Sequence, residues 1–202
     1  MSRFTYEIEN TNTPLETYEW DNVWIEQTNN DIANRVLYIG DSISCGTRNI
    51  ATSISENTYL FDGFGTSKAL DNPFLFDSIH LFAQQLTKTE TVIFNNGLHG
   101  WHLDDTTKYH EFYEKAIKFL LSEFEGKKLF LVLTTSVEDD EREKRVIARN
   151  NVVKELSDKY NLPTIDLYSV SIENKSLRCD DGVHFSRDGY TKFAEKILED
   201  IK

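Results

Sequence analysis

A serine stands where an apolar, strand-like run of the chain stops. The stretch RVLYIGDSISCG, residues 35–46, is apolar up to Gly40 and continues with Asp41 and Ser42. A serine hydroxyl becomes an effective nucleophile only when a neighbouring base takes its proton. Ser42 is therefore either a turn residue or helix N-cap, or a nucleophile held at the end of a strand.

A base and a carboxylate that could orient it occur together near the carboxyl end of the chain. The stretch CDDGVHFSRDGY, residues 179–190, places Asp181 three residues before His184. Imidazole can take a hydroxyl proton near neutral pH, and a carboxylate on its other ring nitrogen fixes the required tautomer. Asp180 competes with Asp181 but lacks the three-residue spacing. Ser42, His184 and Asp181 therefore predict the triad of a serine hydrolase.

The two cysteines, Cys45 and Cys179, are too few for a disulfide framework, and we do not favour a bridge between them. Cys45 follows Ser42 by about one helical turn and is an alternative nucleophile for His184. We favour the serine because it already occupies the end of the strand.

An alternation of strand-like and helix-like runs predicts how these residues are positioned. The strand-like runs are residues 35–40, 58–64, 91–95, 128–135 and 163–168, and helix-like runs follow Pro73, span 106–124 and 140–160, and begin near Arg187. Such alternation predicts a three-layer α/β/α sandwich with a mostly parallel five-stranded sheet. Sites in these sheets form at the carboxyl ends of strands, where Ser42 stands.

Length and charge limit the classes of protein and partner. The chain has 202 residues and a formal net charge of −12, which suits one domain and argues against nucleic acid and anionic membranes as partners. No stretch is long enough for a transmembrane helix, and residues 1–20 lack the apolar core of a signal peptide, so a cytoplasmic location is expected.

The polar residues 1–30 are expected to form an extension packed on a domain of residues 31–202. Trp20 and Trp24 have the spacing of one face of a short helix, although an irregular cover is an alternative.

The stretch IGDS at Ser42, together with DGVH before the last helix, resembles the SGNH/GDSL hydrolase family. The resemblance spans residues 35–201. It implies an SGNH/flavodoxin-like fold, Ser42 as nucleophile, and Asp181 and His184 as its partners. It also implies that a glycine and an asparagine bind the oxyanion formed during acyl transfer.

The third sequence block departs from the G-x-N-D pattern of this family. FNNGLHGWH, residues 94–102, is closer to the N-x-G-H-W stretch of the PC-esterase branch, which includes polysaccharide O-acetyltransferases. Asn96 is the first choice for the oxyanion asparagine and Asn95 the second. In residues 61–73 we favour Gly65 over Gly63 as the oxyanion glycine, and the Ser42 N–H is a further donor.

His99, Trp101 and His102 form a cluster in the same block. We expect them to line the substrate pocket, with Trp101 able to stack on a sugar ring. Plain packing is an alternative, and so is a metal site that adds Asp104 and Asp105. The predicted triad itself requires no metal or organic cofactor.

Together these features predict a serine esterase that hydrolyses a small acyl ester of a small molecule or glycan through an acyl-enzyme. The family resemblance and the aromatic cluster favour a carbohydrate ester as the substrate. A glycan O-acetyltransferase is the first alternative. A catalytically silent glycan-binding module is the second, and the intact triad argues against it. The oligomeric state does not follow from the sequence.

Overall fold

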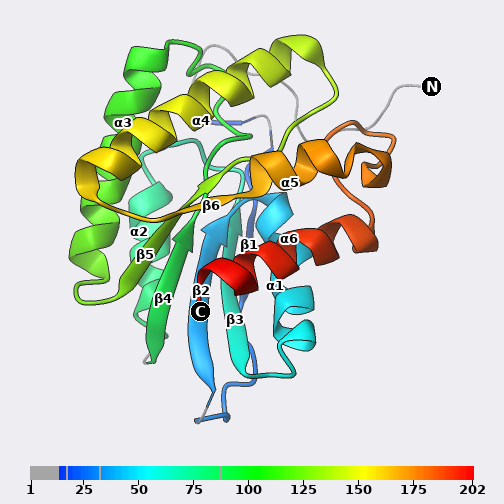
Figure 1. Cartoon of the computed structure of the whole chain (residues 1–202). Helices are drawn as coiled ribbons and strands as arrows, with labels where there is room; N and C mark the ends of the chain where they lie inside the picture. The colour runs from blue at the N-terminus through cyan, green and yellow to red at the C-terminus, as the bar shows by residue number, and fades with distance from the viewer. Residues whose placement is uncertain (1–13, 17, 32, 87) are drawn as a thin grey trace.

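The computed structural model describes residues 14–16, 18–31, 33–86 and 88–202. In chain order the elements are β1 (Asp21–Trp24), β2 (Asn34–Gly40), α1 (Ser42–Ile54), β3 (Tyr59–Thr66), α2 (Leu75–Ala83), β4 (Thr89–Phe94), α3 (Thr106–Glu123), β5 (Lys128–Leu133), α4 (Asp140–Tyr160), β6 (Thr164–Asp166), α5 (Leu167–Glu173), the 3₁₀ turn η1 (Lys175–Leu177) and α6 (Arg187–Asp200). The strand order is β1-β3-β2-β4-β5-β6, and every neighbouring pair is parallel except β1 and β3. The predicted three-layer α/β/α sandwich is confirmed (Figure 1).

The sheet has six strands rather than the predicted five, because the N-terminal segment supplies β1. Its residues Asp21–Trp24 pair antiparallel with the edge of β3. All four are exposed, and Trp24 and Val23 leave large apolar side chains in solvent. The helix considered for Trp20 and Trp24 is therefore wrong: Trp20 lies just before β1, and Trp24 is the last residue of this exposed edge strand. Residues 1–13 of the predicted extension lie outside the described residues.

Two hydrophobic clusters fill the layers on either side of the sheet. Val92 and Phe94 of β4 belong to the cluster formed with α2, α3 and the carboxyl half of α4. Ile93 belongs to the cluster formed with α1, α5 and α6. Because side chains alternate along a strand, the two clusters define the two faces of the sheet at every position. This alternation decides which side chains beyond the strand ends reach the candidate site.

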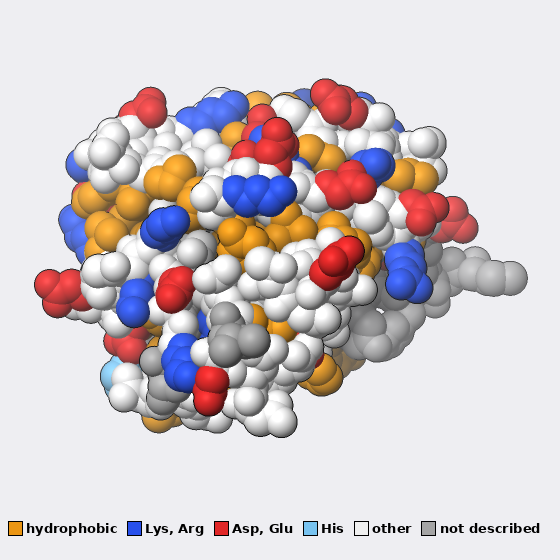
Figure 2. All heavy atoms as spheres, turned by 60° about the horizontal axis from the view of Figure 1, so that its bottom comes forward, with side chains coloured by type: hydrophobic (Ala, Val, Ile, Leu, Met, Phe, Trp, Pro, Cys, Tyr) orange, Lys and Arg blue, Asp and Glu red, His pale blue; other side chains and the backbone are white. Residues whose placement is uncertain are grey.

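The surface carries charges of both signs among apolar side chains. On the face shown in Figure 2, acidic and basic side chains are interspersed and no extended basic patch is seen. Within the described part of the chain, no helix combines the length and apolar character needed to cross a membrane.

Candidate active site

Ser42, His184 and Asp181 form a continuous hydrogen-bonded row. The Ser42 Oγ lies 2.7 Å from His184 Nε2, and His184 Nδ1 lies 2.8 Å from Asp181 Oδ2. The His184 and Asp181 side chains are 34% and 44% exposed, so substrate can reach them. Ser42 and His184 are separated by 142 residues in sequence, and the fold brings them within hydrogen-bond distance.

A sharp strand-to-helix turn presents Ser42. A Cβ on Gly40 would lie 2.8 Å from the Ser44 Cβ, so only glycine allows this close turn. Asp41 then caps α1, because its Oδ1 accepts a hydrogen bond from Ile43 N at 2.9 Å. Ser42 is thereby held as the first residue of α1, at the carboxyl end of β2.

The loop that carries Asp181 and His184 is tied at both ends. Asp181 Oδ1 accepts hydrogen bonds from the N–H groups of Val183 and His184, both at 2.9 Å. The Cys179 N–H donates to the His184 carbonyl at 2.8 Å. Between them Gly182 has φ +77°, a left-handed conformation that favours glycine. The sequence D-x-x-H thus folds as a local turn that orients its own imidazole.

The two aspartates near Ser42 are shifted in opposite directions. Burial raises the pKa of Asp181, but the N–H donors of Val183 and His184 and the His184 ring outweigh it and lower the net value. Burial raises the pKa of Asp41 above its ordinary value, against the favourable charges of His99 and His184. An ionised Asp181 facing His184 is the arrangement that stabilises an imidazolium.

The geometry disfavours Cys45 as the nucleophile. His184 Nε2 contacts the Ser42 hydroxyl, and burial raises the pKa of the Cys45 thiol, which keeps it protonated. Cys45 and Cys179 are both free, so the structure contains no bridge between them.

Gly65 closes the side of the site formed by β3. It pairs with Gly40 across the parallel β2–β3 ladder, and a Cβ on it would meet the Cys45 Sγ at 2.2 Å and the Asp41 carbonyl at 3.5 Å. Gly65 therefore lies directly beside the turn that carries Ser42. Gly63 instead packs under Arg48, which agrees with the preference for Gly65.

The two asparagines after β4 point in different directions. The Asn96 Nδ2 donates to the Lys68 carbonyl at 2.8 Å, so this amide is engaged beside the loop after β3. The Asn95 Oδ1 accepts from the Thr134 hydroxyl at 2.8 Å, while its Nδ2 is buried and has no hydrogen-bond partner among the described residues. Asn95 is therefore the asparagine whose amide nitrogen makes no hydrogen bond to the described residues.

His99 and Glu16 lie together in a buried position behind this loop. His99 is 3% exposed, and its Nδ1 lies 3.8 Å from Glu16 Oε1. Glu16 Oε1 also accepts the Gly100 N–H at 2.9 Å. Burial raises the pKa of Glu16, but these two contacts outweigh it and lower the net value.

Trp101 and His102 do not line an open substrate surface. The Trp101 side chain is buried, and the guanidinium groups of Arg142 and Arg145 lie 5.0 and 4.7 Å from its ring centre. His102 Nε2 is bonded to Asp71 at 2.8 Å. The stacking role predicted for Trp101 is therefore not supported, because α4 covers the ring.

The four side chains considered for a metal site do not converge on one point. His99 faces Glu16 and His102 faces Asp71, while Asp105 caps α3 and Asp104 pairs with Arg145. Within the ranges that the structure describes, no group of three or more His, Cys, Asp or Glu side chains could hold a metal ion.

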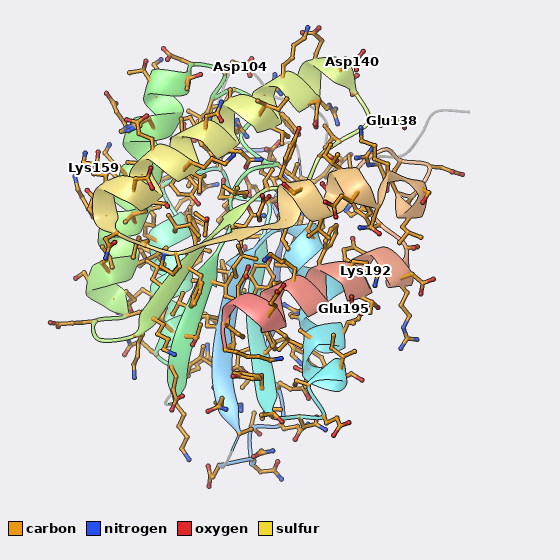
Figure 3. The ribbon with its side chains drawn as sticks, in the orientation of Figure 1. Asp104, Glu138, Asp140, Lys159, Lys192 and Glu195 are labelled. Atoms are coloured by element: carbon orange, nitrogen blue, oxygen red, sulfur yellow. The ribbon has the colours of Figure 1, made fainter. Side chains whose placement is uncertain are left out.

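A cavity of about 240 Å³ adjoins the Asp181 loop. It is lined by Val137, Glu138, Asp139, Arg142, Asp181, Gly182 and Val183. Glu138 lies in the loop just before α4, which begins at Asp140 (Figure 3), and its N–H donates to the Gly182 carbonyl at 2.8 Å. The lining of this cavity is more polar than apolar, and it includes Asp181 but neither Ser42 nor His184.

Sequence reasoning missed Glu16, Thr134 and Arg149, which surround the loop after β4. The Arg149 guanidinium donates to the carbonyls of Gly97, His99, Gly100 and Leu103 at 2.6 to 3.3 Å. No spacing signal could identify these residues, because each acts on groups 39 to 84 residues away in sequence.

The chain was compared with known proteins. No protein-family model matches it, and no curated protein matches it either. Among solved structures it is similar to a lipolytic protein of the G-D-S-L family from Veillonella parvula DSM 2008, with TM-score 0.66, 20% identity, and 83% of this chain and 97% of that chain covered.

Two further structures extend this similarity to proteins named for acetyl groups. The acetyl xylan esterase AlAXEase matches with TM-score 0.64 and 18% identity, over 83% of this chain and 100% of that chain. The catalytic domain of peptidoglycan O-acetyltransferase A from Streptococcus pneumoniae matches with TM-score 0.65 and 18% identity, over 85% of this chain and 94% of that chain. The chain has the fold of the SGNH/GDSL hydrolases, as its sequence motifs predicted.

Proposed function

We propose that this protein is a serine esterase that cleaves a small acyl ester through an acyl-enzyme intermediate. The observation that carries the proposal is the hydrogen-bonded row Ser42–His184–Asp181 at the carboxyl end of β2. Nucleophile, base and orienting carboxylate stand in the order that acyl transfer requires.

The reaction proceeds in two halves. Ser42 Oγ attacks the ester carbonyl carbon while His184 takes the hydroxyl proton. The tetrahedral intermediate collapses, the bond to the alcohol oxygen breaks, and His184 gives its proton to the leaving alcohol. His184 then takes a proton from water, whose oxygen attacks the acyl carbon to form a second tetrahedral intermediate. The bond between the acyl carbon and Ser42 Oγ breaks, His184 returns its proton to that oxygen, and the acid is released. Asp181 holds the imidazole and stabilises its charged form throughout.

Backbone and side-chain N–H groups stabilise the oxyanion in this scheme. The donors are the N–H groups of Ser42 and Gly65 and the amide of an asparagine after β4. The geometry favours Asn95 over Asn96, because the Asn96 amide already donates to Lys68 whereas the Asn95 Nδ2 has no partner among the described residues.

The proposed substrate is a small acyl group, such as acetyl, on a carbohydrate hydroxyl. The shared fold with an acetyl xylan esterase supports it. Acetyl transfer to a glycan hydroxyl is the second candidate, since a peptidoglycan O-acetyltransferase domain has the same fold. Product analysis with an acetyl donor, with and without a soluble sugar acceptor, separates the two by the ratio of free acid to transferred acetyl.

Replacing the nucleophile tests the proposal. Ser42→Ala should lower kcat on aryl acetates by several powers of ten, on the order of 10⁶-fold. Thermal stability should change little, because the Ser42 hydroxyl contacts His184 at a partly exposed surface. Ser53→Ala is the matched control, since Ser53 lies exposed on the same helix and should keep wild-type kinetics.

Covalent labelling checks the same assignment independently of turnover. A serine-directed phosphonate should add one group to the wild-type chain and none to Ser42→Ala, as peptide mass mapping would show. Label on Cys45, or full turnover by Ser42→Ala, contradicts the proposed nucleophile.

A further inference from the structure

A chain of buried hydrogen bonds runs from α4 to the amide of Asn95. The Asn150 side chain bonds both main-chain groups of Thr134, accepting from its N–H at 2.8 Å and donating to its carbonyl at 3.0 Å. The Thr134 hydroxyl in turn donates to the Asn95 Oδ1 at 2.8 Å. All three residues are at least 95% buried, so water does not compete for these bonds.

This chain fixes which end of the Asn95 amide is free. Because the Thr134 hydroxyl occupies Oδ1, Nδ2 must point away from Thr134. Nδ2 is buried and has no hydrogen-bond partner within the described part of the chain. Leaving a buried donor unsatisfied lowers folding stability. Such a group is explained when a ligand supplies the missing acceptor.

The alternation of side chains places Asn95 on the side of the sheet that carries the triad. Ile93 packs into the cluster of α1 and α6, and Asn95 is two residues further along the same strand direction. The Asn95 N–H still bonds the Ile39 carbonyl at 2.9 Å, so the β2–β4 ladder continues to this residue. Ser42 is the first residue of α1 and His184 lies just before α6, and both helices pack on that same side.

Two further contacts hold Thr134 and the loop together. A Cβ on Gly97 would lie 2.3 Å from the Thr134 hydroxyl, so glycine is required for this approach. Arg149, next to Asn150 on α4, donates to the Gly97 carbonyl at 3.1 Å and to three later carbonyls of the loop. One turn of α4 thus braces Thr134 and the segment that follows Asn95.

We propose that Thr134 is a positioning residue: it orients the Asn95 amide so that Nδ2 donates to the oxyanion, and Asn150 holds Thr134 in place. The inference rests on the proposed esterase function. Thr134 touches no reacting atom. It acts by preorganising a donor, which stabilises the transition state without reorganisation at the moment of reaction.

Removing the Thr134 hydroxyl tests the proposal. Thr134→Val keeps the shape of the side chain and should lower kcat by about 10- to 100-fold, less than the 10²–10³-fold typical of losing an oxyanion donor itself. KM should change by less than about twofold, because the ground-state ester makes little use of this donor. Thr134→Ser keeps a hydroxyl and should restore most of kcat.

Thr135→Val is the matched control. Thr135 is equally buried, and its hydroxyl has no hydrogen-bond partner among the described residues. This variant should keep wild-type kcat. A loss equal to that of Thr134→Val would overturn the proposal, since it would show a general effect of the β5 end. Should Thr134→Val fail to fold, Thr134→Ala removes the hydroxyl without the added methyl and gives the same comparison.

A double-mutant cycle separates positioning from general damage. Asn95→Ala should cost about 10²–10³ in kcat, and Thr134→Val should then add less than about twofold, because its target is gone. Additive losses overturn the proposal, as does a kcat loss in Asn96→Ala as large as that in Asn95→Ala. Failure of the esterase function is distinguishable, because the wild type would then hydrolyse no ester, or Ser42→Ala would keep full activity.

Discussion

The Asp181 carboxylate serves the loop and the imidazole with different oxygens. Oδ1 accepts the two backbone N–H groups that form the turn, and Oδ2 faces His184 Nδ1. An asparagine at this position can still satisfy the two N–H groups. Its Nδ2 would then face the imidazole and force the tautomer that cannot take the Ser42 proton.

We therefore expect Asp181→Asn to lower kcat by about 10⁴-fold with a small change in KM. Its unfolding temperature should stay close to that of the wild type, because the turn is preserved. Asp180→Asn is the neighbouring control and should keep wild-type kinetics on the same ester. If Asp180→Asn were the crippling change, the D-x-x-H assignment would be wrong.

Helix α4 links the packing of the molecule to its candidate site. Its carboxyl half packs into the cluster with α2 and α3, while Val146 packs into the cluster with α1 and α6. Its middle carries Arg149 and Asn150, which bond the loops after β4 and β5. The packing of α4 therefore helps to set the position of the Asn95 amide, through Asn150 and Thr134.

Glu114 of α3 ties the two helices together at the surface. It accepts hydrogen bonds from the Tyr160 hydroxyl and from Lys118 and Lys159. These bonds lower the pKa of Glu114 to about 2 from an ordinary value of 4.5. A lowered pKa in the folded state means that the stabilisation is complete above pH 4.5 and is lost as the pH falls toward 2.

We expect the free energy of unfolding of Glu114→Gln to depend less on pH between 4.5 and 2 than that of the wild type. The difference in unfolding free energy between wild type and variant should be constant above pH 4.5 and shrink as the pH falls toward 2. Denaturant titrations across this range measure it. Glu111→Gln, at an exposed position on the same helix, serves as the control. A difference that does not vary with pH would show that the Glu114 contacts contribute no linked stabilisation.

The segment after β1 is fastened to the rest of the molecule by a buried ion pair. Arg35 Nε lies 3.3 Å from Asp62 Oδ2, and these side chains are 8% and 0% exposed. Both bond the main chain of Glu26: Asp62 Oδ1 accepts its N–H at 2.9 Å, and Arg35 donates to its carbonyl. The chain leaving the edge strand is thus held against β2 and β3.

Asp62→Ala should destabilise the fold by about 3–5 kcal/mol, because it leaves the Arg35 charge buried without its partner. Removing both charges with Asp62→Ala and Arg35→Met should cost less than the sum of the two single changes. Denaturant unfolding measures each variant. Asp31→Ala, which breaks the exposed pair with Lys88, should have only a small effect. Additive losses would show that the buried pair is not coupled.

Local patterns in the sequence were sufficient for the architecture. Alternating apolar strands and amphipathic helices predicted the α/β/α sandwich, which the structure confirms. The turn chemistry of Asp181 and His184 lies within four residues, so its spacing could be recognised directly, and the fold brings Ser42 to it. The similarity of the FNNGLHGWH block to the PC-esterase branch stays a prediction.

Contacts between distant residues decided the edge strand, the burial of Trp101 and the choice between the two asparagines. Trp24 became part of an added edge strand because β3 had a free edge, which no periodicity within residues 1–30 reveals. Trp101 became a core residue because arginines from α4 cover it. The choice between Asn95 and Asn96 depends on Thr134 and Lys68, which are 39 and 28 residues away. Sequence spacing determines which face a side chain takes, whereas the partner that holds its amide is set only when separate elements pack together.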